Sequence, residues 1–71
     1  MARFTAHTAT TKADGAKFNA VKDNETGDVA LFYFDPTDPM TDVIDAMDDG
    51  NLGWVWQSET TVTLTNQEPR A

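Results

Sequence analysis

The residues with the most capacity for chemistry in this 71-residue sequence are carboxylates at regular spacing. Asp38, Asp42, Asp45 and Asp49 are four, three and four residues apart, and Asp48 lies beside them. In an α-helix, at about 100° per residue, the four fall within about 60° of one another. The apolar residues of the same segment, Met40, Val43, Ile44 and Met47, fall on the opposite side. The spacing predicts an amphipathic helix with carboxylates toward water, a surface suited to cationic groups.

Catalysis and metal binding are weaker interpretations of the same acids. General acid–base catalysis needs a carboxyl group with a shifted pKa in a pocket, and these acids are expected to be exposed. The segment 45–51 has oxygen ligands for Ca²⁺ but lacks the order of an EF-hand loop and its bidentate Glu. His7 has no second His and the chain has no Cys, so no zinc site is expected. We therefore predict a protein that is not an enzyme and holds no metal or cofactor.

The simplest explanation for the acids is an ordinary solvent-exposed helix face. This explanation accounts for some of the acids and not for others. The helix dipole favours acids in the first turn, which suits Asp38 and Asp42. Asp48 and Asp49 would stand at the negative end of the dipole. Like charges four residues apart, as in Asp45 and Asp49, cost roughly a few tenths of a kcal/mol per pair. Something other than local helix stability is therefore expected to favour these carboxylates.

Charge is distributed unevenly along the chain. The total is −7, from 5 Lys+Arg against 12 Asp+Glu. The first 22 residues hold four basic side chains and one acid, whereas 23–69 holds eleven acids and no Lys or Arg. Such acidity disfavours direct binding to nucleic acid or to an anionic membrane, because both need a basic patch. It leaves two explanations open: adaptation to a high-salt cytoplasm, since Asp and Thr abound, or a surface for a basic partner.

The second explanation predicts a function. Acids along a helix repeat every ~4.5–6 Å, which is comparable to the phosphate spacing of nucleic acid, so the stripe could occupy a cationic groove built for DNA or RNA. In its small size and acidity the chain resembles phage-encoded inhibitors, including some anti-CRISPR proteins. The resemblance is one of type, and no sequence motif is shared. We predict a cytoplasmic, acidic protein-binding module that occludes a basic surface of a partner; for a viral protein the compartment would be the host cytoplasm. The predicted contact residues are Asp38, Asp42, Asp45, Asp48 and Asp49, with Glu25 and Asp28 as second choices.

The elements that must position these residues follow from periodicity and turn signals. Alternation predicts strands at 3–10, 16–22, 29–34, 52–57 and 61–65. A hairpin loop with Gly27 at positive φ is expected at 23–28. Asp38 as N-cap and Pro39 in the first turn predict a helix over 39–49. The order β-β-β-α-β-β predicts an α+β domain spanning 1–71, in which one helix covers one face of a four- to five-stranded antiparallel sheet. The tail 67–71 is expected to be frayed.

Aromatic residues support a rival interpretation. The expected core is Phe4, Phe18, Leu31, Phe32, Phe34, Trp54, Val55, Trp56, Val62 and Leu64. Trp54 and Trp56 share one face of a predicted strand, and at least one of them is expected in the core. A single helix leaves the other sheet face open, and an exposed apolar patch often marks an interface. The alternative is therefore a structural or assembly subunit, including a homodimer, that associates through an aromatic sheet face containing Trp54 and Trp56. In that case the acidity would reflect a high-salt host.

Overall fold

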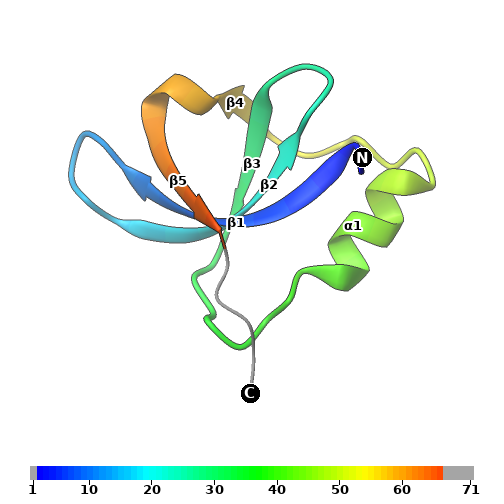
Figure 1. Ribbon diagram of the computed structural model, residues 1–71, viewed down its shortest axis with the longest axis horizontal. Coiled ribbons are helices and arrows are strands. Elements are labelled where there is room, and N and C mark those ends of the chain that lie inside the picture. The colour runs from blue at the N-terminus through cyan, green and yellow to red at the C-terminus, as the bar shows by residue number, and fades with distance from the viewer. Residues whose placement is uncertain (1, 67–71) are drawn as a thin grey trace.

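The computed structural model describes residues 2–66, which form a five-stranded antiparallel sheet and one helix (Figure 1). The elements in chain order are β1 (Phe4–Thr11), β2 (Lys17–Asp23), β3 (Asp28–Phe32), α1 (Thr41–Asp48), β4 (Trp56–Ser58), the 3₁₀ turn η1 (Glu59–Thr61) and β5 (Val62–Asn66). The predicted class and element order are confirmed. The predicted frayed tail, 67–71, lies outside the described residues. In the described part, no helix is long and apolar enough to cross a membrane.

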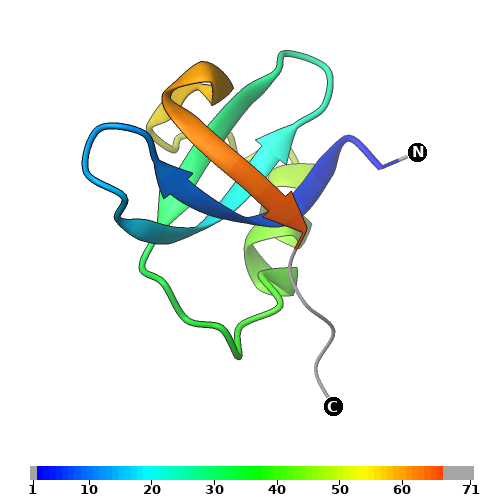
Figure 2. The same cartoon turned by 60° about the vertical axis from the view of Figure 1, so that its left-hand side comes forward.

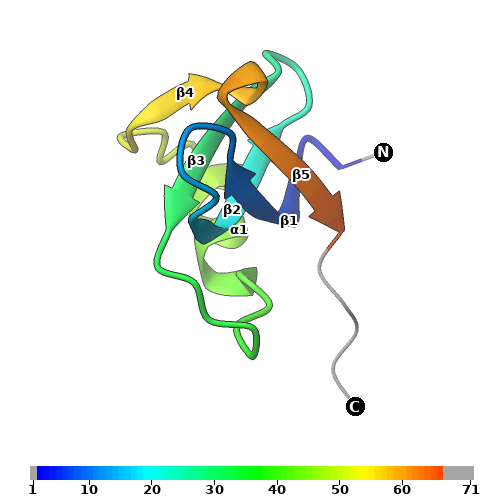
Figure 3. The ribbon, with the colours of Figure 1, turned by 90° about the vertical axis from the view of Figure 1, so that its left-hand side faces the viewer.

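The sheet is curled, with strand order β4-β3-β2-β1-β5. Strand β1 pairs with β2 on one side and with the last strand, β5, on the other. Figures 2 and 3 show β5 crossing over β1 instead of extending a flat sheet. Ala9 of β1 and Ala20 of β2 are fully buried beneath this crossing. Their short side chains let the strands approach closely, which favours the curl.

One face of the sheet packs against α1. Its buried centre contains Phe4, Val21, Ala30, Met40 and Met47, and half-buried apolar side chains surround it. Met47 comes from the helix and Val21 from the central strand. Both are almost fully buried, so this cluster ties α1 to the sheet. The predicted orientation of the helix, apolar side toward the sheet, is confirmed.

The opposite face has a second, smaller cluster. Ala9, Ala20, Val29 and Val62 are buried there, with Leu31 and Leu64 packed against them. The curl of the sheet itself covers these residues, because β5 brings Val62 over β1 and β2. In a flat two-layer arrangement the sheet face opposite the helix would be open to solvent. Here part of that face is buried.

The helix begins later than predicted. It spans Thr41–Asp48, and Met40 precedes it with a left-handed backbone, φ 62°. Asp38 Oδ1 accepts a hydrogen bond of 2.8 Å from the Met40 N–H, so Asp38 closes a turn before the helix and is not its N-cap. Met40 holds its unfavourable φ because its side chain is buried in the core beside α1. The prediction that Pro39 starts the helix was wrong, because the left-handed Met40 separates Pro39 from the first helical residue, Thr41.

Two strands also end earlier or start later than predicted. Strand β3 stops at Phe32, after which Tyr33 and Phe34 leave the sheet and are exposed. Strand β4 contains only Trp56–Ser58 rather than 52–57, and Val55 is 88% exposed. The predicted core positions Phe34 and Val55 were therefore wrong. Their apolar character suited a strand, but neither residue has a neighbouring strand to pack beside.

The β2–β3 hairpin agrees with its prediction. Gly27 has φ 82° and its N–H donates to the Asp23 carbonyl over 2.8 Å. The Asp23 carboxylate accepts from the Glu25 N–H at 2.9 Å. A glycine with positive φ closes this turn without the steric cost that a side chain would carry.

Candidate functional site

Helix α1 presents a row of carboxylates to solvent. Asp42, Asp45 and Asp48 lie within the helix, and Asp49 is its C-cap residue. All four are exposed, whereas the apolar residues on the other side of the helix are buried or half-buried. Figure 1 shows the helix at one edge of the molecule, with its outer side away from the sheet. The sequence-predicted acidic face is therefore present and accessible over these four residues.

The acids of this face have no partner within residues 2–66. No ion pair or side-chain hydrogen bond joins Asp42, Asp45, Asp48 or Asp49 to another described residue. The last turn of α1 contains no basic residue to offset its negative end. The carboxylates of this short helix and its C-cap thus repel one another with no compensating cation in the described fold.

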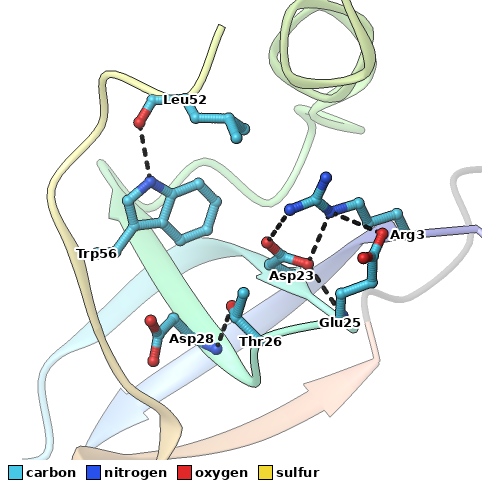
Figure 4. A network of polar contacts seen from close by, with 7 residues as sticks. All are labelled: Arg3, Asp23, Glu25, Thr26, Asp28, Leu52 and Trp56. Carbon is cyan, nitrogen blue, oxygen red and sulfur yellow. Dashed lines mark hydrogen bonds and ion pairs between the residues drawn. The ribbon is translucent and has the colours of Figure 1, made fainter. Parts of the chain in front are cut away.

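Several acids outside the helix, unlike those of α1, form ion pairs with basic side chains. Arg3 donates to both carboxylate oxygens of Asp23, over 3.1 and 3.0 Å, and its Nε lies 3.1 Å from Glu25 Oε2 (Figure 4). Lys22 Nζ lies 3.0 Å from a carboxylate oxygen of Glu59. Two of the four basic residues of the first 22 positions are thereby neutralised inside the fold. The N-terminal hairpin therefore has fewer unpaired basic side chains than its sequence suggests.

The structure separates the predicted contact residues into groups. Asp38 is exposed but lies before the left-handed Met40, so it does not continue the helical row. Glu25 is drawn to Arg3 and belongs to the β2–β3 hairpin. Asp28 begins β3, where its N–H donates to Thr26 Oγ1 at 3.2 Å (Figure 4). The compact acidic surface is therefore Asp42, Asp45, Asp48 and Asp49, hereafter the acidic helix face.

The two tryptophans pack against the core cluster on the helix side. Trp54 meets Phe32 edge to face with ring centroids 5.3 Å apart, and Trp56 lies 6.4 Å from Phe4. The Trp54 indole N–H donates to the Asn51 carbonyl. The Trp56 indole N–H donates to the Leu52 carbonyl, the contact that Figure 4 shows. Both side chains are half-buried against the helix-side cluster. Neither tryptophan is among the fully buried core residues, so the expectation of a core tryptophan holds only in that both pack against the core cluster.

The exposed apolar surface is elsewhere. Phe18, Leu31, Phe32 and Tyr33 line a shallow groove of about 360 Å³ at the end of β3. Tyr33 is 95% exposed. Sequence reasoning placed the first three of these residues in the core. The signal that could have shown the groove is the apolar run at 29–34, which is longer than the strand that pairs with it.

The described residues contain no obvious reactive centre. No group of three His, Asp or Glu side chains within 2–66 could hold a metal ion. The His7 Nε2 atom lies 2.7 Å from Thr5 Oγ1. Burial, with a smaller effect of Lys22, lowers the pKa of His7, so the neutral ring is favoured near neutral pH. A half-buried neutral His beside a hydroxyl is consistent with a structural role.

Comparison of the chain with protein-family models, with curated proteins and with solved structures finds no match in any of the three.

Proposed function

We propose that this protein is a non-enzymatic binding module whose acidic helix face docks onto a basic surface of another protein. One observation carries the proposal: Asp42, Asp45, Asp48 and Asp49 are all exposed and have no partner within residues 2–66, while Arg3 and Lys22 serve acids elsewhere. A helix selected for stability alone would place Lys or Arg in its last turn. A cationic partner would supply the missing counter-charge.

The partner we favour is a nucleic-acid-binding protein. The acidic helix face carries charge at intervals of ~4.5–6 Å along its axis, which suits a groove lined for phosphates. The protein would then act as an inhibitor of the phage or anti-CRISPR type, excluding nucleic acid sterically and electrostatically. Association between complementary charged surfaces is fast and sensitive to salt.

The experiment compares charge variants in affinity capture. The double reversal of Asp42→Lys and Asp45→Lys is expected to abolish capture of the partner, and raising salt from about 0.05 to about 0.5 M is expected to release it. A short DNA duplex added in excess should compete with the protein for the same partner. Capture that survives both the reversal and the salt would refute the proposal.

A matched control separates position from total charge. The neutral variant with Asp42→Asn and Asp45→Asn gains two charge units, and so does a variant with Thr63→Lys and Thr65→Lys on β5, whose side chains are exposed. The proposal requires the first pair to weaken capture much more than the second. Equal weakening would mean that only net charge matters, as salt adaptation predicts.

The assembly alternative has its own measurement. The exposed Tyr33, Phe34 and Val55 favour it more than Trp54 and Trp56, which are half-buried against the helix-side cluster. If the chain is a self-associating subunit, light scattering will show a dimer or larger species whose mass is unchanged by the Asp42 and Asp45 reversals. A monomer at all concentrations would refute this alternative.

A further inference from the structure

The end of β3 combines three features that the acidic helix face does not explain. The apolar groove of Phe18, Leu31, Phe32 and Tyr33 opens there. The pairing of β3 with β4 stops at Ala30 opposite Trp56. Lys17, at the start of the neighbouring strand β2, has an exposed side chain. We propose that this site binds an extended segment of a partner protein, which adds to β3 as an antiparallel strand.

The strand edge is open because β4 is short. Continued pairing would place Val55 opposite Leu31 and Trp54 opposite Phe32, in the register that joins Ala30 to Trp56. Instead, Val55 is 88% exposed, and the Trp54 indole N–H donates to the Asn51 carbonyl at 3.0 Å. Figure 3 shows β3 continuing past the end of β4. Leu31 and Phe32 therefore have no strand partner on that side among the described residues, and an unpaired edge is a template for another strand.

The side chains next to this edge define what the added strand would carry. Phe18 and Leu31 lie on the sheet face opposite α1, and Tyr33, which directly follows β3, lines the groove beside them. Every second residue of an added strand would point to this face and meet them. Those residues of the partner should be apolar. The residues between them would point toward the helix side, the side of Lys17.

Charge decides between a partner and a second copy. The Lys17 ammonium lies 5.8 Å from the centroid of the Phe34 ring, and no ion pair joins it to another described residue. A carboxylate on the added strand would pair with it. A second copy of this chain would bring two formal charges of −7 together, which opposes association. The occupant is therefore a segment of another protein with alternating apolar residues and an acid between them.

The test uses a defined probe, the capped peptide Thr-Ile-Asp-Ile-Thr, added to isotope-labelled protein and followed by amide NMR. We expect shifts centred on residues 31–33, slower hydrogen exchange of amides at that edge, and saturation near the millimolar range, about 1 mM. The peptide Thr-Ile-Lys-Ile-Thr should bind about two- to fivefold more weakly, the usual effect of one exposed ion pair. A peptide with N-methylated backbone amides should not bind, because it cannot complete the strand.

Matched variants isolate Lys17. The variant Lys17→Gln should remove the preference for the Asp peptide over the Lys peptide, whereas Lys12→Gln, an equal charge change on an exposed turn residue, should retain it. Absence of shifts up to about 5 mM peptide, a range that would detect weak binding, overturns the proposal. So does equal binding of the N-methylated peptide, or a preference that survives Lys17→Gln.

The test is independent of the acidic helix face. The reversals Asp42→Lys and Asp45→Lys should leave peptide binding unchanged, so the two proposals fail separately. If the signals of residues 31–33 shift with protein concentration alone, the site is an interface between copies of this chain and the proposed occupant is wrong.

Discussion

Arg3 and Asp23 form a two-point ion pair next to the paired strands β1 and β2, with Nε–Oδ1 and Nη2–Oδ2 distances of 3.1 and 3.0 Å. The carboxylate is nearly buried, with 5% of its side chain exposed, while 38% of the Arg3 side chain is exposed. The pair connects the start of β1 to the β2–β3 hairpin, where Asp23 also accepts from the Glu25 N–H. It thereby fixes the edge of the helix-side cluster that contains Phe4.

The variant Asp23→Asn should destabilise the fold. It retains the shape of the side chain and loses the charge-assisted bonds to Arg3. We expect the melting temperature near neutral pH to fall by about 4 °C or more, since a lost charged hydrogen bond costs enough to be visible in so small a domain. The control is Asp28→Asn, whose carboxylate has no ion pair among the described residues. Equal losses in both variants would contradict a special role for the Arg3–Asp23 pair.

The same pair should make stability depend on acid pH. Hydrogen bonding to Arg3 lowers the pKa of Asp23 below its usual value of 3.8. A lowered carboxyl pKa stabilises the fold above the unfolded pKa, and this contribution disappears as the pH falls through the folded pKa. The gap in melting temperature between wild type and Asp23→Asn should therefore close as the pH falls below about 4 and through the lowered pKa of Asp23. A gap that stays constant over this range would contradict the assignment.

The variant Asp49→Lys should stabilise the isolated protein while weakening its proposed binding. Asp49 caps the C-terminal end of α1, where a cation is favoured by about 0.3–1 kcal/mol at low ionic strength. The substitution would also remove the like-charge repulsion between this position and Asp45. Chemical denaturation measures the gain in unfolding free energy, and the variant Thr63→Lys on β5 shows the effect of an added lysine away from the helix. If Asp49→Lys were destabilising, the acids of α1 would have a structural role that the fold does not show.

The core assignments can be tested at two apolar positions. Met47→Ala should cost about 2–5 kcal/mol, because the Met47 side chain is 2% exposed between α1 and the sheet. Val55→Ala should change the unfolding free energy by less than about 0.5 kcal/mol, because Val55 is 88% exposed. The measurement is denaturant unfolding of the two variants, in which the m-values should equal that of the wild type. A comparable cost at both positions would mean that β4 continues through Val55 in solution.

Salt separates the two explanations of the acidity. If the carboxylates serve a partner, the unpaired acids of α1 repel one another only weakly, and unfolding free energy should level off once screening is complete, near about 0.5 M KCl. If they reflect a high-salt host, stability should continue to rise well above that concentration. Thermal unfolding over a KCl series distinguishes the two curves.

Local signals in the sequence determined much of this protein. The alternation of apolar residues located every strand within a few positions, Gly27 marked its hairpin, and the acids spaced three and four apart located the exposed side of α1. Each of these features depends on residues close together in the chain. The acidic helix face could therefore be proposed without coordinates.

Tertiary structure decided which residues those local patterns serve. Met40 takes a left-handed conformation that separates Asp38 from the helical row, and its buried side chain is what retains that conformation. The indole bonds of Trp54 and Trp56 accompany the departure of residues 51–55 from β3, which leaves Val55 exposed and opens the groove beside Tyr33. Pairing across the chain also placed Arg3 beside Asp23 and Lys22 beside Glu59. These outcomes depend on contacts between residues distant in sequence, and composition and periodicity contain no information about them.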